Sequence, residues 1–351
     1  MSRETVAVAM SGGVDSAAAA LLLLEAGYNV WGVTLRLQSC PGAAEAAERE
    51  ISAAGEACRA LGIPHRVLDL RQRFRETVMD RFVSEYLAGR TPNPCVDCNR
   101  EIKFGVLLDW VLEQGADFLS TGHYARVDRA DEGGRWRLLR GRDRRKDQSY
   151  VLYQLTQRQL AHLLLPLGDY DKPAVRALAE GRGLSNAKKA DSQDICFIPD
   201  GDYAAFLARS GAALVPGDFL DESGRVLGRH RGLPCYTPGQ RKGLGVSAGE
   251  PVYVLRKEAE GNRIVLGPDT RLYTTELTAE RVNWLSVSPP EGPLAVTAKT
   301  RYTQREAAAT AEVLPDGRLH VTFQEPQRAV TAGQAVVLYA GEAVAGGGTI
   351  C

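Results

Sequence analysis

Apolar and polar residues along the first half of the chain form blocks that predict strands followed by helices. The opening run Thr5–Met10 is almost entirely apolar and predicts a buried strand, and the alanine- and leucine-rich run Ala17–Glu25 predicts a helix that ends at Gly27. Further strands are predicted at residues 29–37, 64–70 and 117–121, and further helices at 43–61, 74–88 and 104–114. Strands that alternate with helices are typical of a parallel sheet with helices on both faces, in which ligands bind at the carboxyl ends of the strands.

The pattern changes after about residue 210. Glycine and proline become frequent, helical periodicity fades, and from about residue 273 short β-rich runs are separated by turns such as Pro315-Asp316-Gly317. The runs at residues 294–300, 307–314, 319–323 and 335–339 predict a small antiparallel barrel or sandwich. The predicted organisation is an α/β domain at 1–209, a small linking domain at 210–272 and a β-rich domain at 273–351.

Composition narrows the class of protein. The 351 residues suffice for two or three domains, 44% of them are apolar, and basic and acidic residues balance at 43 each. A neutral chain argues against non-specific coating of nucleic acid but allows a local basic patch, and basic residues gather around Trp136, where a solvated hairpin is an equally good interpretation. No apolar run reaches the length of a membrane span, and the first strand leaves no room for a signal peptide, so we expect a cytoplasmic protein without membrane contact.

The segment Ser11–Ser16 (Ser-Gly-Gly-Val-Asp-Ser) joins the first predicted strand to the first predicted helix. Glycines let the main chain approach an anion closely, and the helix start adds amide groups and a positive dipole end. The hydroxyls of Ser11 and Ser16 add donors, and Asp15 is suited to hold Mg²⁺ or to orient a ribose or pyrophosphate group. The segment lacks the Gly-Lys-Ser/Thr ending of the Walker loop and instead resembles the PP-loop of ATP pyrophosphatases, which split ATP between the α and β phosphates. The alternative is an ordinary glycine turn.

Three of the seven cysteines lie in segments that suggest chemistry. Cys95 and Cys98 form a C-x-x-C pair in a predicted proline-rich loop at 91–100, and Arg100 and Lys103 nearby predict a lowered thiol pKa. Cys196 stands far away in sequence. The odd count argues against a disulfide framework, and a single C-x-x-C leaves half a zinc site and a redox role equally open. Cys58 is predicted to be core, and packing or surface placement is expected for Cys40, Cys235 and Cys351.

Seven segments, in this order, resemble the tRNA-specific 2-thiouridylase family over essentially the whole chain: 11–16, 91–104, 121–126, 146–150, 191–198, 236–245 and 346–350. The resemblance implies a PP-loop domain of the adenine nucleotide α-hydrolase-like fold, a small linking domain and a C-terminal β-barrel that contacts tRNA. It implies that ATP, with Mg²⁺, adenylates the C2 oxygen of the wobble uridine (U34) in tRNAs for Lys, Glu and Gln, and that sulfur then displaces AMP. A cysteine desulfurase or a sulfur-relay protein would supply the sulfur.

The resemblance also implies roles for individual residues. The ATP-binding set is Ala9, Met10, Ser11, Gly12, Gly13, Val14, Asp15 and Ser16, with Leu35 and Gly122 on the adenosine side. The target base would meet Asn93, Pro94 and Cys95, and other parts of tRNA would meet Lys146, Asp147, Gln148, Arg301 and Tyr302. Cys98 matches the nucleophile and Cys196 the cysteine that forms a persulfide. His123 suits a positioning role as well as that of a base.

Cys95 departs from the family, because many members have Asp at this position. Two sulfur routes then compete: a persulfide relay through Cys196 and Cys98, and a [4Fe–4S] cluster held by Cys95, Cys98 and Cys196. Both need the thiols of Cys98 and Cys196 to converge beside the α-phosphate. Other functions remain open as well: another PP-loop ligase that modifies tRNA, or a non-enzymatic, nucleotide-regulated tRNA-binding protein.

Overall fold

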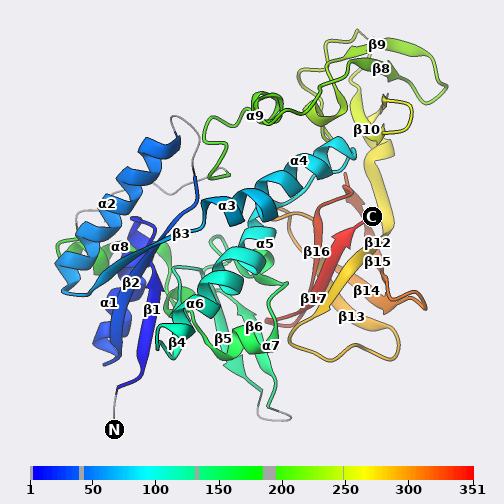
Figure 1. Cartoon of the computed structure of the whole chain (residues 1–351). Helices are drawn as coiled ribbons and strands as arrows, with labels where there is room; N and C mark the ends of the chain where they lie inside the picture. The colour runs from blue at the N-terminus through cyan, green and yellow to red at the C-terminus, as the bar shows by residue number, and fades with distance from the viewer. Residues whose placement is uncertain (1–2, 39–42, 131–133, 185–194, 248) are drawn as a thin grey trace.

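The computed structural model describes residues 3–38, 43–130, 134–184, 195–247 and 249–351 (Figure 1). A parallel sheet with its helices, a small unit of four strands and a barrel make up the chain, and the barrel lies beside the sheet domain and below the small unit in Figure 1. In the described part of the chain, no helix combines the length and the apolar character that crossing a membrane requires.

The first domain is built on a five-stranded parallel sheet in the order β3-β2-β1-β4-β7, as the alternating pattern predicts. Its strands are β1 (Thr5–Ala9), β2 (Asn29–Arg36), β3 (His65–Asp69), β4 (Phe118–Ser120) and β7 (Leu163–Leu164). Side chains alternate along β1, so Val6 and Val8 pack on α1 (Val14–Glu25), α2 (Ala43–Leu61) and α8 (Lys172–Gly181), while Ala7 packs on the opposite face. The carboxyl ends of β1, β2 and β4 therefore form one edge.

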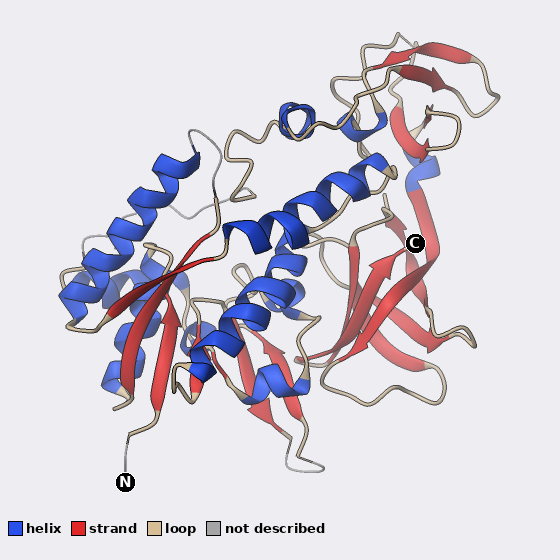
Figure 2. Cartoon of the chain, viewed as in Figure 1, coloured by secondary structure: helices blue, strands red, loops and turns tan. Residues whose placement is uncertain are grey.

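A helical rod leads from the end of β3 towards the small unit (Figure 2). It comprises α3 (Arg71–Phe74), a π-helical stretch η1 (Arg75–Met79) and α4 (Asp80–Leu87). A second run comprises α5 (Pro94–Asp97), the π-helical stretch η2 (Cys98–Leu107) and α6 (Leu108–Glu113). The predicted loop at 91–100 is therefore wrong from Pro94 onward, because Asn93 caps the helix by accepting from the Cys95 amide at 3.2 Å and proline is tolerated at the first helical position.

Six antiparallel strands form a closed barrel, because β12 pairs with both β15 and β17. The strands are β12 (Tyr273–Trp284), β13 (Leu294–Lys299), β14 (Ala307–Val313), β15 (Leu319–Arg328), β16 (Ala335–Ala340) and β17 (Ala343–Ile350). Closure depends on glycine in β17, since a Cβ on Gly346 would lie 2.2 Å from the Asn283 carbonyl oxygen. The glycines at 346–348 thus have a structural role, and the barrel alternative of the prediction is the one observed.

The basic segment around Trp136 forms a hairpin, β5 (Ala125–Arg129) with β6 (Trp136–Arg140), which extends the barrel sheet beside β17. Arg137 pairs with Asp128, and buried Arg140 pairs with Glu306 between β13 and β14 and lies 4.0 Å from the Tyr339 ring. The contacts of Arg140 therefore hold the first domain and the barrel together.

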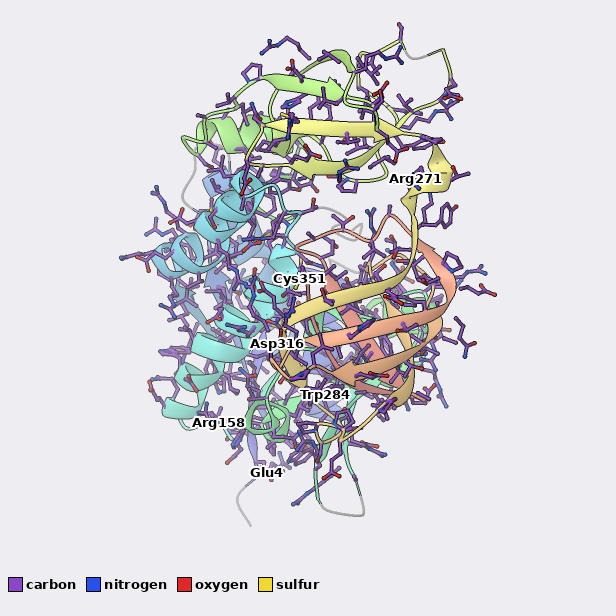
Figure 3. All side chains as sticks on the ribbon, turned by 90° about the vertical axis from the view of Figure 1, so that its right-hand side faces the viewer. Glu4, Arg158, Arg271, Trp284, Asp316 and Cys351 are labelled. Atoms are coloured by element: carbon purple, nitrogen blue, oxygen red, sulfur yellow. The ribbon has the colours of Figure 1, made fainter. Side chains whose placement is uncertain are left out.

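The small unit contains β8 (Gly217–Leu220), β9 (Val226–His230), β10 (Tyr253–Glu258) and β11 (Arg263–Gly267), in the order β10-β11-β8-β9. Arg271 lies where this unit joins the barrel (Figure 3) and pairs with Glu222 at 2.9 Å. The remaining helices are η3 (Ser149–Leu152), α7 (Gln157–Ala161), η4 (Pro166–Asp169), α9 (Tyr203–Arg209), η5 (Leu233–Cys235) and η6 (Asp269–Leu272).

Candidate nucleotide and sulfur site

The segment Ser11–Ser16 is a tight turn at the carboxyl end of β1. Gly12 has a φ of +70°, and a Cβ there would lie 2.7 Å from the Glu50 carbonyl oxygen of α2, so glycine is required. The Ser16 hydroxyl accepts from the Ser11 amide and donates to the Gly13 carbonyl oxygen, each at 3.1 Å. Gly13 is the residue before α1, and it has no side chain that could compete with an anion at the first turn of this helix.

Gly122 and the carboxylate of Asp15 lie together beside this turn. A Cβ on Gly122 would come within 2.9 Å of the Asp15 Cβ and the Ser16 nitrogen. Asp15 Oδ1 accepts from the Tyr124 hydroxyl at 2.7 Å, and the Lys172 ammonium donates to Oδ1 at 2.7 Å and to Oδ2 at 2.8 Å. Lys172 and Tyr124 were not predicted as site residues from the sequence, because neither belongs to a spacing pattern that links it to Asp15.

Other members of the predicted ATP set contribute more to the core than to an open surface. Met10 is 2% exposed, and its carbonyl oxygen accepts from the Thr34 hydroxyl at 2.8 Å. Ala9 and Leu35 are half-buried and pack against the cluster that contains Phe104. Leu35 also packs on the cluster that contains Cys98, so this one side chain contacts both the predicted adenosine side and the core around the Cys98 thiol.

The structure brings Cys98 and Cys196 together. Cys98 is 8% exposed and lies in one apolar cluster with Phe197 and Ile198, the residues that follow Cys196. Burial, the neighbouring Cys98 and Cys95, and Glu50 of the helix that packs on Gly12 all raise the pKa of the Cys196 thiol. Four residues of the segment 191–198 and Cys40 lie outside the described residues.

The predicted lowering of the thiol pKa is wrong. Burial raises the pKa of Cys98 to about 11 and that of Cys196 to about 12, and it also raises the pKa of Cys95. Lys103 opposes each shift, but Arg100 is directed to Glu101, 2.7 Å away. Cys98 is buried, whereas Cys95 and Cys196 are exposed residues. The thiols of this state are therefore protonated at neutral pH.

The three cysteines do not fit a resident iron–sulfur cluster as they are arranged. Across the described ranges, no three Cys, His, Asp or Glu side chains converge closely enough to hold a metal ion, and all three thiols belong to those ranges.

His123 lies near residues from two parts of the site, Thr121 beside Gly122 and Phe104 of η2. It follows Gly122, its Nδ1 lies 2.7 Å from the Thr121 hydroxyl oxygen, and its ring centroid lies 5.8 Å from that of Phe104. Burial and the charge of Lys103 hold the pKa of His123 well below its usual range, so the imidazole is neutral at pH 7.

The residues predicted to contact tRNA have differing surroundings. Asp147 accepts from the Ser149 amide at 3.1 Å and Gln148 from the Tyr124 amide at 3.0 Å, so both support the local fold. Arg301 donates to Pro238, Ala329 and Thr331. Tyr302 is 38% exposed, its ring centroid lies 6.0 Å from that of Tyr150, and the Lys299 ammonium lies 5.8 Å from the same centroid. Lys146 is half-buried in the turn before Asp147.

A cavity of about 550 Å³ opens beside the thiol segments. It is lined by residues of all three parts of the chain, including Asn93, Pro94, Ile195, Tyr203, Cys235 and Gln334. Gln334 of the barrel donates to the Thr91 carbonyl oxygen at 2.8 Å, which joins the barrel to the segment that carries Cys95. Sequence analysis gave no indication of Gln334.

Comparison with known proteins agrees with this architecture. Residues 4–200 match a family described as "tRNA methyl transferase HUP domain", residues 204–268 its PRC-barrel domain, and residues 274–350 an "Aminomethyltransferase beta-barrel domain". The tRNA-specific 2-thiouridylase MnmA of Pelotomaculum thermopropionicum is 49% identical over 100% of this chain and 98% of its own length. That of Moorella thermoacetica is 50% identical over 98% of both. The chain belongs to the tRNA-specific 2-thiouridylase family.

Among solved structures, a U34-tRNA thiolase NcsA from Methanococcus maripaludis with its [4Fe-4S] cluster is similar at a TM-score of 0.35. It is 21% identical, and the match covers 59% of this chain and 64% of that one.

Proposed function

We propose that this chain is a tRNA-uridine 2-sulfurtransferase that uses ATP to replace the C2 oxygen of the wobble uridine (U34) with sulfur. The observation that carries the proposal is the convergence of Cys98 and Cys196 next to residues that pack on the phosphate turn. A ligase without sulfur chemistry has no need for two such thiols. The curated relatives that span the whole chain carry the name of this activity.

The first half of the reaction is adenylation of the uridine. The amide-like C2 oxygen of uridine is a poor leaving group, and attachment of AMP makes it a good one. The turn at 11–16 and the start of α1 suit the ATP phosphates, and Gly122, which we place on the adenosine side, packs directly against Asp15 and Ser16 of this turn. Asp15 would hold the Mg²⁺ that accompanies ATP, because Mg²⁺ is commonly bound by one carboxylate together with substrate phosphates.

The second half is sulfur transfer. A cysteine desulfurase or a relay protein delivers one sulfur atom to Cys196 as a persulfide. The Cys98 thiolate attacks the inner sulfur, hydrosulfide leaves and a Cys98–Cys196 disulfide forms. Hydrosulfide adds to C2 of the adenylated uridine, AMP departs, and an external thiol reduces the disulfide.

The tRNA would approach through the cavity next to Asn93, Pro94 and Cys95. A uridine in a stacked anticodon loop cannot reach buried thiols, so the base must be flipped out of the stack. The partly exposed ring of Tyr302 suits a neighbouring base, and Lys146 suits a phosphate. A tRNA substrate implies that the protein works in the cytoplasm.

The test combines purified protein with tRNA, ATP, Mg²⁺ and a persulfide donor, followed by mass spectrometry of the digested tRNA. We expect 2-thiouridine at position 34 and one AMP per thiolated base. Cys98→Ser and Cys196→Ser should lower product formation by about 100-fold or more, because each removes a covalent step. Exposed Cys351→Ser is the matched control and should change nothing.

Several results would contradict the proposal. Product without sulfur, formed equally by the Cys98→Ser/Cys196→Ser protein, would indicate another tRNA ligase. Binding of tRNA without release of AMP would indicate a binding protein. Iron analysis of anaerobically purified protein separates the sulfur routes: iron-free, colourless protein that thiolates tRNA supports the persulfide route, and activity that strictly follows iron content supports a [4Fe–4S] cluster.

A further inference from the structure

Lys172 is a buried cation at the phosphate turn. It is the first residue of α8, after Asp171, which caps the helix by accepting from the Ala174 amide at 2.8 Å. Only 8% of Lys172 is exposed, and because lysine is almost never buried without a partner, its ammonium group needs one. Its ammonium group meets both oxygens of Asp15, at 2.7 and 2.8 Å.

Tyr124 fixes the same carboxylate from another side. Its hydroxyl donates to Asp15 Oδ1 at 2.7 Å, and Lys172 Nζ lies 5.8 Å from its ring centroid. Tyr124 is itself 3% exposed, and the Gln148 side chain accepts from its amide at 3.0 Å. The orientation of Asp15 is therefore set by two buried side chains from different segments of the chain.

Relative exposure indicates which member of the pair faces a ligand. The side chain of Asp15 is 32% exposed, whereas that of Lys172 is 10% exposed. Asp15 is therefore the more accessible member of the pair, and Lys172 would act on a ligand through Asp15.

Helix packing does not account for this pair. The helices α1 and α8 already share an apolar cluster that includes Ala20, Leu23, Val175 and Ala179. A second ion pair, Arg182 with Glu25, joins the same region of the two helices at the surface. A buried ion pair is weak evidence for stability, since desolvation offsets most of its attraction.

We infer that Lys172, together with Tyr124, is a positioning residue that fixes the Asp15 carboxylate at the phosphate turn for the magnesium complex of the nucleotide. Lys172 balances the charge of Asp15, so the turn alone offers Mg²⁺ no excess negative charge. The nucleotide phosphates supply that charge, and Mg²⁺ therefore binds together with them. This inference relies on the proposed function only for the use of ATP.

The test is equilibrium binding of α,β-methylene-ATP, whose α–β bridge cannot be cleaved, at a series of Mg²⁺ concentrations. Lys172→Met should weaken Mg²⁺-dependent binding about 10- to 100-fold, which corresponds to loss of hydrogen bonds to a charged group. In an Asp15→Asn background the same change should alter the affinity by less than about threefold, because a residue that acts through Asp15 has no effect without it.

Arg182→Gln is the matched control, because it removes the surface ion pair with Glu25 in the same region of the two helices, and it should bind like the wild type. Should Lys172→Met fail to fold, Tyr124→Phe removes one hydroxyl at nearly constant volume and should weaken binding about tenfold. Wild-type affinity in Lys172→Met or Tyr124→Phe would overturn the inference. So would losses that multiply in the double variant, or an equal loss in Arg182→Gln. The assay contains neither tRNA nor a sulfur donor, so its outcome does not depend on whether thiolation is the reaction.

Discussion

At the scale of single residues, burial dominates the protonation of the thiols. Lys103 lowers the pKa of Cys95, Cys98 and Cys196, but desolvation outweighs it at each position. A thiol that stays protonated is slow to react with adventitious electrophiles, and the proposed reaction needs its thiolate only when persulfide and tRNA are present. The resting site is thus protected.

The first prediction concerns the pH dependence of Cys98 alkylation. Burial raises the pKa of Cys98 to about 11, so the folded protein should react with iodoacetamide about tenfold faster for each unit of pH increase up to that value. Peptide mass spectrometry measures the rate for this cysteine alone. The same protein in urea is the control, and its rate should level off near the ordinary thiol pKa of about 8.5. A plateau at that lower pH in the folded protein would contradict the prediction.

The second prediction concerns Gly122. A methyl group there would lie 2.9 Å from the Asp15 Cβ and the Ser16 nitrogen, so Gly122→Ala should displace the phosphate turn and weaken ATP binding by about tenfold or more. Isothermal titration with α,β-methylene-ATP measures the affinity. Unchanged affinity would contradict the prediction, because it would mean that the phosphate turn shifts to accept the methyl group without any loss of ATP affinity.

At the scale of elements, the π-helical stretch η2 shapes the thiol site. It begins at Cys98. Its wider turn brings the Arg100 carbonyl oxygen close to Gly105, where a Cβ would lie 2.9 Å from that oxygen, so glycine is required. Such stretches are frequent at functional sites. In η2, Cys98 packs among the side chains of the α3–α4 rod and the segment after Cys196.

The third prediction compares two helical glycines. Gly105→Ala should lower the free energy of unfolding by about 1–3 kcal/mol, because the methyl group meets main chain that cannot move freely. Gly181→Ala, at the end of α8, meets no atom within 4 Å in the described part of the chain and should raise the free energy of unfolding by about 0.5 kcal/mol. Urea-induced unfolding measures both. The same sign for both variants would contradict the π-helical geometry of η2.

At the scale of the whole molecule, the candidate site depends on how the domains meet. The cavity beside the thiols takes its lining from all three parts, and Lys257 of β10 lies in the joint between the small unit and α4. Its ammonium lies 5.7 Å from the Tyr86 ring and donates to the Arg90 carbonyl oxygen at 3.3 Å. Burial lowers the pKa of Lys257 to about 8.

The fourth prediction follows from that shift. Between the folded-state pKa of about 8 and the ordinary value of 10.5, the unfolded chain keeps the proton of Lys257 and the folded chain has lost it, so this residue makes the free energy of unfolding rise with pH. At pH 7 both states are protonated and the full cost of burying the charge remains. Lys257→Met should therefore add about 1–3 kcal/mol at pH 7 and remove this rise.

Urea-induced unfolding of the wild type and the variant, at steps of about one pH unit from neutral pH to the ordinary lysine pKa, measures this effect. The thiols titrate in both proteins, so their contribution cancels in the difference between the two curves. A difference that stays constant across the range would refute the role of Lys257.

The sequence alone predicted the features whose causes are local. The strand, glycine turn and helix around Ser11–Ser16 are consecutive, and local pattern and chain geometry are enough to specify them. Pattern also predicted the parallel sheet and the β-rich end. The predicted loop at 91–100 was wrong in part because Pro94 can start a helix as readily as it interrupts one.

Only the tertiary structure decided the rest, because burial and long-range contact are not properties of a segment. Asp15 and Lys172 are 157 positions apart in the chain, yet their side chains form an ion pair. Cys98 likewise packs on Phe197 and Ile198, which follow Cys196 in a distant segment. Both contacts depend on the packing of the whole domain, so no local pattern could have indicated them.

The same reason explains the thiol pKa values and the closed barrel. Neighbouring charges in the sequence favoured a lowered pKa for Cys98, but the surrounding core, assembled from distant segments, raises it. Likewise, the sequence determined short strands with turns between them, whereas the pairing of β12 with β17 and the attachment of the β5–β6 hairpin arise only when distant parts of the chain fold back on one another. Local pattern determines which element forms, and the packed structure determines what each side chain meets.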